Sequence, residues 1–272
     1  MRSFRTRNVT VDGVDTHFID EGEGQPIVLI HGGGAGADSR GNWSDIIPFF
    51  SPHRRVIALD MLGFGFTGKP DGDFVYSQDA RNRHLIGFLE TLDLHGAVLV
   101  GNSMGGATAI AAAVERPDRV SKLVLMGSAG LVMHLGEAIQ SVLKYDFTRE
   151  GMVRIIRALT SEGYVLDDAL VDYRVDLASD PEARRAYAAT MKWVHDQGGL
   201  YYDPSYVASV RIPTLIVNGK QDKVVSLDLA RQFLDLIPRS WGYFIPDCGH
   251  WAMIEHPQDF SRTTLAFVEA AH

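Results

Sequence analysis

The chain has only one cysteine, Cys248, among its 272 residues. A single cysteine cannot form a disulfide within the chain, and it leaves no cysteine cluster to hold a metal ion. Low cysteine content is typical of a reducing compartment, so we expect a cytoplasmic protein. We also expect a protein that works without a metal or another cofactor.

Positive charge and long apolar runs are also scarce. Lysine and arginine number 26 against 34 aspartates and glutamates, which gives a formal net charge of −8. This balance argues against nucleic acid and anionic membranes as partners, and an anionic ligand would need a local cation. No apolar run approaches the length of a membrane span. We therefore expect no membrane partner, and the sequence leaves the oligomeric state open, a homo-oligomer included.

The chain is rich in short apolar runs that alternate with helical patterns. The apolar runs predict strands at 26–30, 55–60, 97–100, 122–126, 213–219 and 241–245. Residues 8–20 alternate polar and apolar around Asp12-Gly13, as an antiparallel hairpin does. Strands that alternate with helices predict an α/β fold with a mostly parallel sheet and helices on both faces.

From about residue 130 the pattern becomes helical only, as far as about residue 206. We interpret 131–206 as a helical lid inserted into a core made of 1–130 and 207–272. Two helix starts are marked within the lid. Asp167 is a predicted N-cap, and Asp180 is followed by proline and glutamate, which favour a first helical turn.

Residues 101–105, Gly-Asn-Ser-Met-Gly, lie between the strand at 97–100 and a helix of small residues. They match the G-x-S-x-G pattern, in which a serine stands on a sharp turn between strand and helix. The glycines are needed because the two backbones approach closely there. A serine in an ordinary turn would not need glycine on both sides, so we predict that Ser103 is a nucleophile.

A serine nucleophile needs a base, and the base needs an acid that orients it. In the α/β-hydrolases these residues follow in the order Ser, Asp or Glu, His. Asp222 and His250 each come just after a predicted strand, so we expect them at the carboxyl edge of the sheet. Asp228 is the rival acid but lies inside a predicted helix, and His256 precedes a proline that indicates a helix start.

Two glycine-rich segments need an explanation. An oxyanion hole takes one N–H from the residue after the nucleophile, Met104, and one from a glycine-rich loop, where we choose Gly33. Residues 32–37 and 63–68 also fit a dinucleotide fingerprint, with Asp60 as its ribose acid. Residues after 68 cannot open a helix, however, and the first segment is better explained as the oxyanion loop.

One arginine lies on an apolar helix face. In the helix predicted from 168 to 178, Arg174 shares its face with leucine and valine residues. A buried guanidinium without an anion is costly, so Arg174 is a snorkelling residue, a structural ion-pair partner or a clamp for a carboxylate. Asn42, Asn102 and Trp251 border the predicted site. Asn42 fits a helix cap equally well, and Trp251 a packing residue.

Several motifs together resemble the meta-cleavage product hydrolases, which are carbon–carbon bond hydrolases of bacterial aromatic degradation with the α/β-hydrolase fold. The motifs are His-Gly-Gly-Gly at 31–34 with Asn42, Gly-Asn-Ser-Met-Gly-Gly-Ala-Thr at 101–108, Leu-Met-Gly-Ser-Ala-Gly at 125–130, Arg174, and Cys-Gly-His-Trp at 248–251. The resemblance covers essentially the whole chain and is nearest to the carbazole and dibenzofuran branch. Residues 38–41, Asp-Ser-Arg-Gly, depart from the Gly-Trp-Ser type of the biphenyl enzymes.

The resemblance implies hydrolysis of a 6-substituted 2-hydroxy-6-oxohexa-2,4-dienoate to 2-hydroxypenta-2,4-dienoate and a carboxylic acid. The dienol would first ketonise, the C6 carbonyl would then be attacked with Ser103 as the nucleophile, and the C5–C6 bond would break. The sequence leaves open whether the serine attacks directly or assists the attack of a water molecule. His250 would act as base and later as acid, with Asp222 as its partner. The residues implied for substrate binding are Asn42, Asn102, Arg174 and Trp251.

Two other functions fit the same sequence. A carboxylesterase would use the same triad and would not depend on Arg174. A ligand receptor on a hydrolase fold would bind a small molecule with negligible turnover. Dehalogenases and epoxide hydrolases are disfavoured, because their nucleophile is an aspartate where Ser103 stands.

Overall fold

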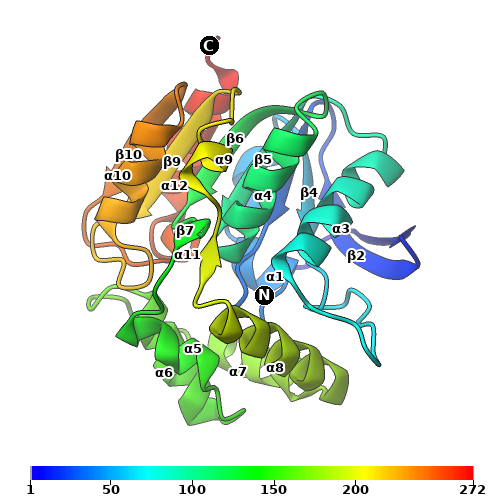
Figure 1. Ribbon diagram of the computed structural model, residues 1–272, viewed down its shortest axis with the longest axis vertical. Coiled ribbons are helices and arrows are strands. Elements are labelled where there is room, and N and C mark those ends of the chain that lie inside the picture. Colours follow the sequence, from blue (N-terminus) through cyan, green and yellow to red (C-terminus); the bar gives the residue numbers. More distant parts are fainter. Residues whose placement is uncertain (1, 272) are drawn as a thin grey trace.

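A twisted eight-stranded sheet forms the centre of the computed structural model, which describes residues 2–271 (Figure 1). The strand order is β1-β2-β4-β3-β5-β6-β9-β10. The strands are β1 (Thr6–Val11), β2 (Val14–Glu21), β3 (Pro26–Ile30), β4 (Arg55–Leu59), β5 (Ala97–Asn102), β6 (Val120–Met126), β9 (Thr214–Gly219) and β10 (Ser240–Ile245). β2 pairs antiparallel with β1 and β4, and all other neighbours are parallel. The mostly parallel sheet predicted from the sequence is confirmed.

The predicted hairpin is also confirmed, because β1 and β2 pair across a turn at Asp12 and Gly13. Both turn residues have positive φ, 48° and 81°, which suits the right-handed twist of the two strands.

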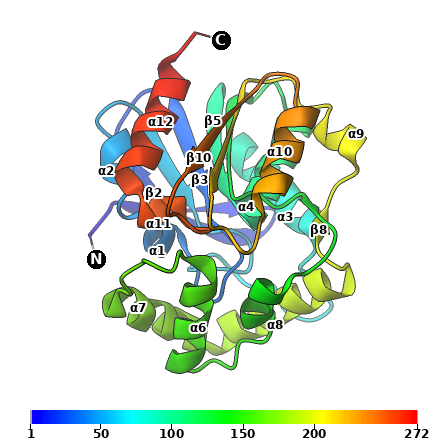
Figure 2. The ribbon, with the colours of Figure 1, turned by 90° about the vertical axis from the view of Figure 1, so that its left-hand side faces the viewer.

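Helices cover both faces of the sheet, and β3 and β5 are therefore buried along their whole length. Figure 2 shows α2 and α12 on one face and α3, α4 and α10 on the other. The bounds are α2 (Ile47–Phe50), α3 (Gln78–Thr91), α4 (Met104–Glu115), α10 (Leu227–Leu236) and α12 (Pro257–Glu269). Two short helices, α1 (Ser39–Trp43) and α11 (Ala252–Glu255), follow β3 and β10.

A group of helices lies outside the sheet, between β6 and β9 in the chain (Figures 1 and 2). Its members are η1 (Glu137–Ile139), α5 (Gln140–Leu143), α6 (Arg149–Leu159), α7 (Asp168–Ser179) and α8 (Pro181–Asp196). The short helix α9 (Pro204–Val207) also precedes β9 in the chain, but it lies beside α10 and away from this group. The predicted N-caps are confirmed, since the Asp167 side chain accepts from Ala169 N and that of Asp180 accepts from Ala183 N.

The expectation of helices alone in this region is wrong at its two ends. β7 (Leu131–Val132) and β8 (Leu200–Tyr201) pair antiparallel where the chain leaves and rejoins the core. Strands of two residues are too short to produce an alternating pattern, so the sequence gives no sign of them.

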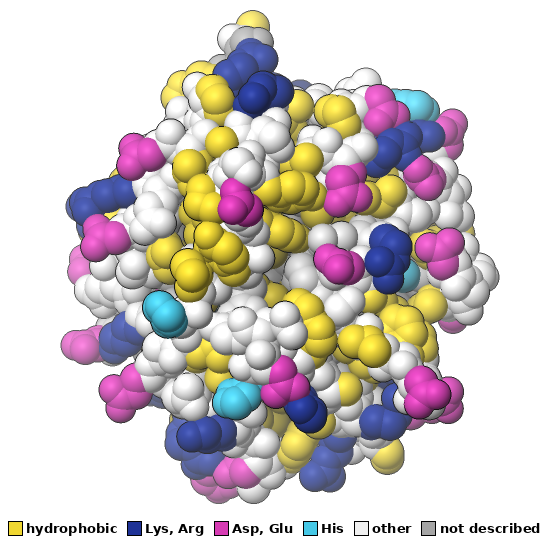
Figure 3. All heavy atoms as spheres, viewed as in Figure 1, with side chains coloured by type: hydrophobic (Ala, Val, Ile, Leu, Met, Phe, Trp, Pro, Cys, Tyr) yellow, Lys and Arg dark blue, Asp and Glu magenta, His cyan; other side chains and the backbone are white. Residues whose placement is uncertain are grey.

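Acidic and basic side chains are interspersed around the face shown in Figure 3, while hydrophobic side chains gather near its middle. Within residues 2–271, none of the helices has both the length and the apolar character needed to cross a membrane.

The backbones of α4 and β3 approach closely at Gly105. A Cβ placed on this residue would lie 2.3 Å from the carbonyl oxygen of Ile30, in β3. Helix α4 can therefore approach the sheet only because residue 105 is glycine.

We predict that Gly105→Ala lowers the free energy of unfolding by about 3 kcal/mol, because the backbone of α4 must move away from β3. Urea denaturation measures this change. Gly163→Ala is the matched control, since a Cβ there meets nothing within 4 Å. Equal stability of the two variants would contradict the close approach.

Candidate active site

Ser103 occupies a strained turn between β5 and α4. Its φ of 54° and ψ of −120° lie in a region that costs a non-glycine residue about 1–3 kcal/mol. Backbone hydrogen bonds hold this conformation: Ser103 N donates to Met126 O at 3.1 Å, and Ser103 O accepts from Ala129 N at 3.0 Å. The strand, sharp turn and helix predicted around Ser103 are thus confirmed.

Asp222 and His250 form a buried pair at the ends of β9 and β10. Asp222 Oδ2 lies 2.8 Å from His250 Nδ1, and Oδ1 accepts from Val224 N and Val225 N, both at 2.8 Å. An ionised carboxylate only accepts, so Nδ1 carries the hydrogen and Nε2 is left as the basic nitrogen. The rival Asp228 is exposed and pairs with Arg231 at 2.9 Å. His256 precedes α12, as expected.

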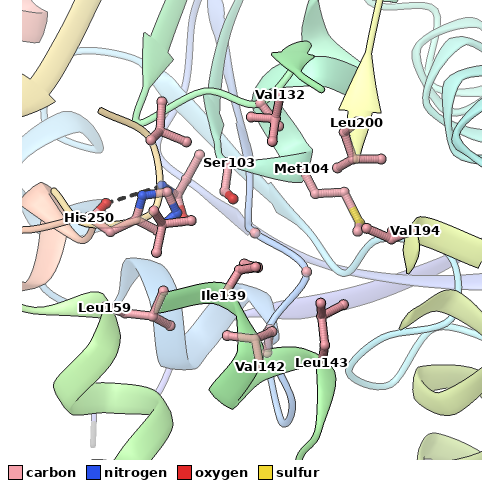
Figure 4. A pocket seen from close by; sticks show the side chains of 18 of the residues that line it. Ser103, Met104, Val132, Ile139, Val142, Leu143, Leu159, Val194, Leu200 and His250 are labelled. Atoms are coloured by element: carbon pink, nitrogen blue, oxygen red, sulfur yellow. Dashed lines mark hydrogen bonds between the residues drawn. The ribbon is translucent and has the colours of Figure 1, made fainter. Parts of the chain in front are cut away.

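A pocket opens beside Ser103 and His250 (Figure 4). Eight predicted site residues line it: Gly33, Asn42, Asn102, Ser103, Met104, Arg174, His250 and Trp251. Asp222 is not in its wall, because it contacts the ring nitrogen on the other side of His250. Much of the remaining wall is apolar and includes Val132, Ile139, Val142, Leu143, Val194 and Leu200. The site therefore combines a polar part with an apolar part.

The glycine-rich loop runs next to the nucleophile. A Cβ on Gly32 would lie 3.2 Å from Ser103 Cβ, and one on Gly33 would lie 2.5 Å from Met104 Cε. Gly33 and Met104, the two predicted oxyanion donors, are thus direct neighbours. Their role as donors stays a prediction.

Arg174 belongs to α7, and its side chain is completely buried and forms part of the pocket wall. Its Nη2 donates to Asn42 Oδ1 at 2.7 Å and its Nη1 to Ala35 O at 3.2 Å, while Cζ lies 4.5 Å from the centre of the Trp251 ring. Within residues 2–271 it forms no salt bridge. Desolvation lowers the pKa of Arg174 to about 10, so the guanidinium is still charged at neutral pH. Neither snorkelling nor a structural ion pair explains it.

The side chains of Asn42 and Asn102 form hydrogen bonds other than those of a helix cap. Asp38, not Asn42, caps α1 by accepting from Gly41 N, so the capping interpretation of Asn42 is wrong. Asn102 Nδ2 donates to Met126 O at 3.0 Å and lies 3.5 Å from His250 O. The Asn102 side chain therefore joins β6 to the histidine loop, and a contact with substrate stays a prediction.

Asp60, the candidate ribose acid, uses its carboxylate in hydrogen bonds within the core. Its carboxylate accepts from Ser39 N at 2.7 Å and Phe66 N at 2.8 Å, and it lies 2.8 Å from His17 Nδ1. The glycine-rich segment at 63–68 passes around this carboxylate. The second fingerprint thus has a structural explanation.

Glu255 is a functional candidate that the sequence reasoning missed. Its Oε1 accepts from Gly249 N at 2.9 Å and its Oε2 from Ser161 N at 2.7 Å. In addition, His250 N donates to Leu159 O at 2.9 Å. Glu255 thus joins the histidine loop to the end of α6. The only sequence signal is an acid five residues after His250, and that alone does not identify its partners.

Comparisons with known proteins agree with this geometry. Residues 25–257 match the family described as alpha/beta hydrolase fold. The chain is 54% identical over 263 residues to the 2-hydroxy-6-oxo-6-(2'-aminophenyl)hexa-2,4-dienoic acid hydrolase of Metapseudomonas resinovorans, covering 96% of this chain and 90% of that protein. It is 35% identical over 269 residues to the 2-hydroxy-6-oxo-2,4-heptadienoate hydrolase of Pseudomonas putida, covering 97% and 96%.

A solved structure is similar over nearly the whole chain. The crystal structure of a serine hydrolase involved in carbazole degradation has a TM-score of 0.91 and 52% sequence identity, and the match covers 98% of this chain and 99% of that one.

We predict that a fluorophosphonate probe labels the protein at Ser103, because the turn and the His250–Asp222 pair make this hydroxyl nucleophilic. Ser103→Ala should abolish labelling, and Asp222→Asn should slow it about 10³–10⁴-fold by leaving the imidazole in the wrong tautomer. Mass spectrometry locates the adduct. The exposed Ser121 provides the control variant, Ser121→Ala. Undiminished labelling of Ser103→Ala would refute the assignment.

Proposed function

The chain belongs to the meta-cleavage product hydrolases of the α/β-hydrolase fold, and on this basis we propose that Ser103, His250 and Asp222 form its catalytic triad. The reaction is hydrolysis of the C5–C6 bond of a 6-substituted 2-hydroxy-6-oxohexa-2,4-dienoate. The products are 2-hydroxypenta-2,4-dienoate and a carboxylic acid.

The observation that carries the site assignment is the buried charge of Arg174 in the pocket wall, which forms no salt bridge within residues 2–271. In a site of low dielectric constant, such a charge attracts the carboxylate of the dienoate strongly. Asn42, Asn102 and Trp251 complete the binding site for this end of the substrate. The C6 carbonyl then lies at Ser103, and the substituent on C6 enters the apolar part of the pocket.

The first step is ketonisation, in which the proton of the 2-hydroxyl is lost and C5 gains a proton. His250 Nε2 then takes the proton of the Ser103 hydroxyl while the serine oxygen bonds to C6. The resulting oxyanion accepts from the N–H groups of Gly33 and Met104, and each such donor contributes about 3 kcal/mol.

Bond cleavage follows from the collapse of this intermediate. The electron pair of the C5–C6 bond passes through the C3–C4 double bond to the oxygen on C2, which takes the proton held by His250. The acyl group stays on Ser103 until a water molecule, deprotonated by His250, releases it as the carboxylic acid.

We propose an aromatic ring as the C6 substituent. Valine, isoleucine and leucine side chains face this part of the pocket (Figure 4), and a flat apolar ring suits such a wall. In addition, the 54% identical relative acts on a dienoate with a 2'-aminophenyl group.

Residues 131–206 act as the lid in this proposal, and 1–130 with 207–272 act as the core. Val142, Leu159 and Met191 of the lid face the pocket, so the lid helps to exclude water from it. The free thiol of Cys248 is buried, which suits a cytoplasmic location.

The test of the function mixes the purified protein with coloured 6-phenyl and 6-(2'-aminophenyl) dienoates and follows the loss of visible absorbance. We expect rapid bleaching with both acid products, and much slower cleavage of p-nitrophenyl butyrate. Rapid ester cleavage without bleaching would indicate a carboxylesterase instead. Absence of both reactions would indicate a ligand receptor.

Replacing Arg174 tests the carboxylate clamp. We predict that Arg174→Ala lowers kcat/KM for the dienoate about 100-fold, because an ion pair with two hydrogen bonds is lost, and leaves p-nitrophenyl butyrate cleavage unchanged. Arg154→Ala is the control, since Arg154 is an exposed lid arginine paired with Asp146. Equal losses on both substrates would contradict the clamp.

A further inference from the structure

Asp38 is a buried carboxylate at the contact between core and lid. It directly precedes α1 and has no exposed surface. Its Oδ1 accepts from Gly41 N at 2.6 Å, and its Oδ2 accepts from the hydroxyl of Tyr173 at 2.5 Å. Gly41 belongs to α1 and Tyr173 to α7. One carboxylate therefore holds a helix of the core and a helix of the lid together.

The same two helices carry Arg174 and its neutral hydrogen-bond partner, Asn42. Arg174 follows Tyr173 in α7, and its Nη2 donates to Asn42 Oδ1 in α1 at 2.7 Å. The helix α7 also lies very close to the loop before α1, because a Cβ on Gly36 would be 2.1 Å from Arg174 O. This close contact blocks movement of α7 toward the core, and the hydrogen bond from Tyr173 to Asp38 opposes movement away from it.

We propose that Asp38 is a positioning residue, which fixes α7 against α1 through Tyr173 and thereby sets the affinity of Arg174 for the substrate carboxylate. Asp38 is not part of the pocket wall, so it acts through Arg174 and Asn42 and does not touch the substrate. The inference rests on the proposed role of Arg174 as the carboxylate clamp. The proposed role of Asp38 also assigns a function to the segment 38–41, where the sequence differs from the biphenyl enzymes.

Titratable groups face Asp38 from two parts of the fold, the end of β4 and the helix α7. Asp60 lies at the end of β4 and is itself held by His17 at 2.8 Å, while Arg174 and Tyr173 face Asp38 from α7. Burial, together with the nearby Asp60 carboxylate, raises the pKa of Asp38 to about 6.

The raised pKa has two consequences. Below pH about 6 the carboxyl group becomes protonated and accepts more weakly from Tyr173 and Gly41. In the unfolded chain the group titrates near 4, so its ionisation costs folding free energy as the pH rises from about 4 to about 6. An ionised Asp38 is therefore unfavourable for stability, which is consistent with a role in function. Burial and the Asp38 carboxylate raise the pKa of Tyr173, which stays neutral and donates throughout this range.

The experiment compares Asp38→Asn and Tyr173→Phe with wild type on the 6-phenyl dienoate and on p-nitrophenyl butyrate at pH 7.5. We expect KM for the dienoate to rise about 10-fold in both variants, with kcat/KM for the neutral ester changed less than 2-fold. The double variant should show no further loss, because both changes remove the same hydrogen bond, the one that the Tyr173 hydroxyl donates to the ionised carboxylate of Asp38. Asp45→Asn, at an exposed acid next to α1, is the matched control and should behave as wild type.

A pH series adds a measurement, the pH dependence of KM, that general damage to the fold would not change. The wild-type KM for the dienoate should rise as the pH falls from 7 to 5 and approach that of Asp38→Asn, whose KM should change much less. Unchanged KM values in Asp38→Asn and Tyr173→Phe, alongside a raised KM in Arg174→Ala, would overturn this inference and leave the clamp intact. Equal losses on both substrates would also overturn it. No effect of Arg174→Ala would refute the clamp itself.

Discussion

A buried guanidinium that forms no salt bridge within residues 2–271 is the constraint on which the proposed site depends. Transfer of Arg174 from water is costly, and its protein partners are all neutral: an amide oxygen, a backbone carbonyl oxygen and the face of an indole ring. These contacts reduce the cost and leave the positive charge available to a ligand. An acidic protein with a net charge of −8 can thus bind an anion, because the attraction is local and shielded from water.

The core and the lid contribute different parts of the site, so their alignment matters. Turns after parallel strands supply Ser103, Asp222 and His250, while the lid helix α7 supplies Arg174. Two carboxylates outside the triad join these parts. Glu255 links the histidine loop to α6 through Gly249 N and Ser161 N, and Asp38 links α1 to α7 through Gly41 N and Tyr173. One link lies near His250 and the other near Arg174.

Local signals were sufficient to predict the sheet and the hairpin, because each depends on residues close together in the sequence. The triad prediction combined local signals with the order in which these residues follow in the α/β-hydrolases. The turn at Ser103 needs its glycines, and Asp222 and His250 follow apolar strands. The alternatives for Arg174 stayed open because a helical pattern gives the face of a residue but not its partner. Asp38 and Glu255 were missed for a related reason: their lid partners lie 135 and 94 residues away in the chain.

The most direct test of this account is a crystal structure of Ser103→Ala with a bound 6-phenyl dienoate. The account predicts carboxylate oxygens within about 3 Å of the Arg174 guanidinium, the C6 carbonyl oxygen directed at the N–H groups of Gly33 and Met104, and the phenyl ring against Val142 and Leu143. A substrate bound in the opposite direction, with the ring at Arg174 and the carboxylate in the apolar part of the pocket, would contradict it.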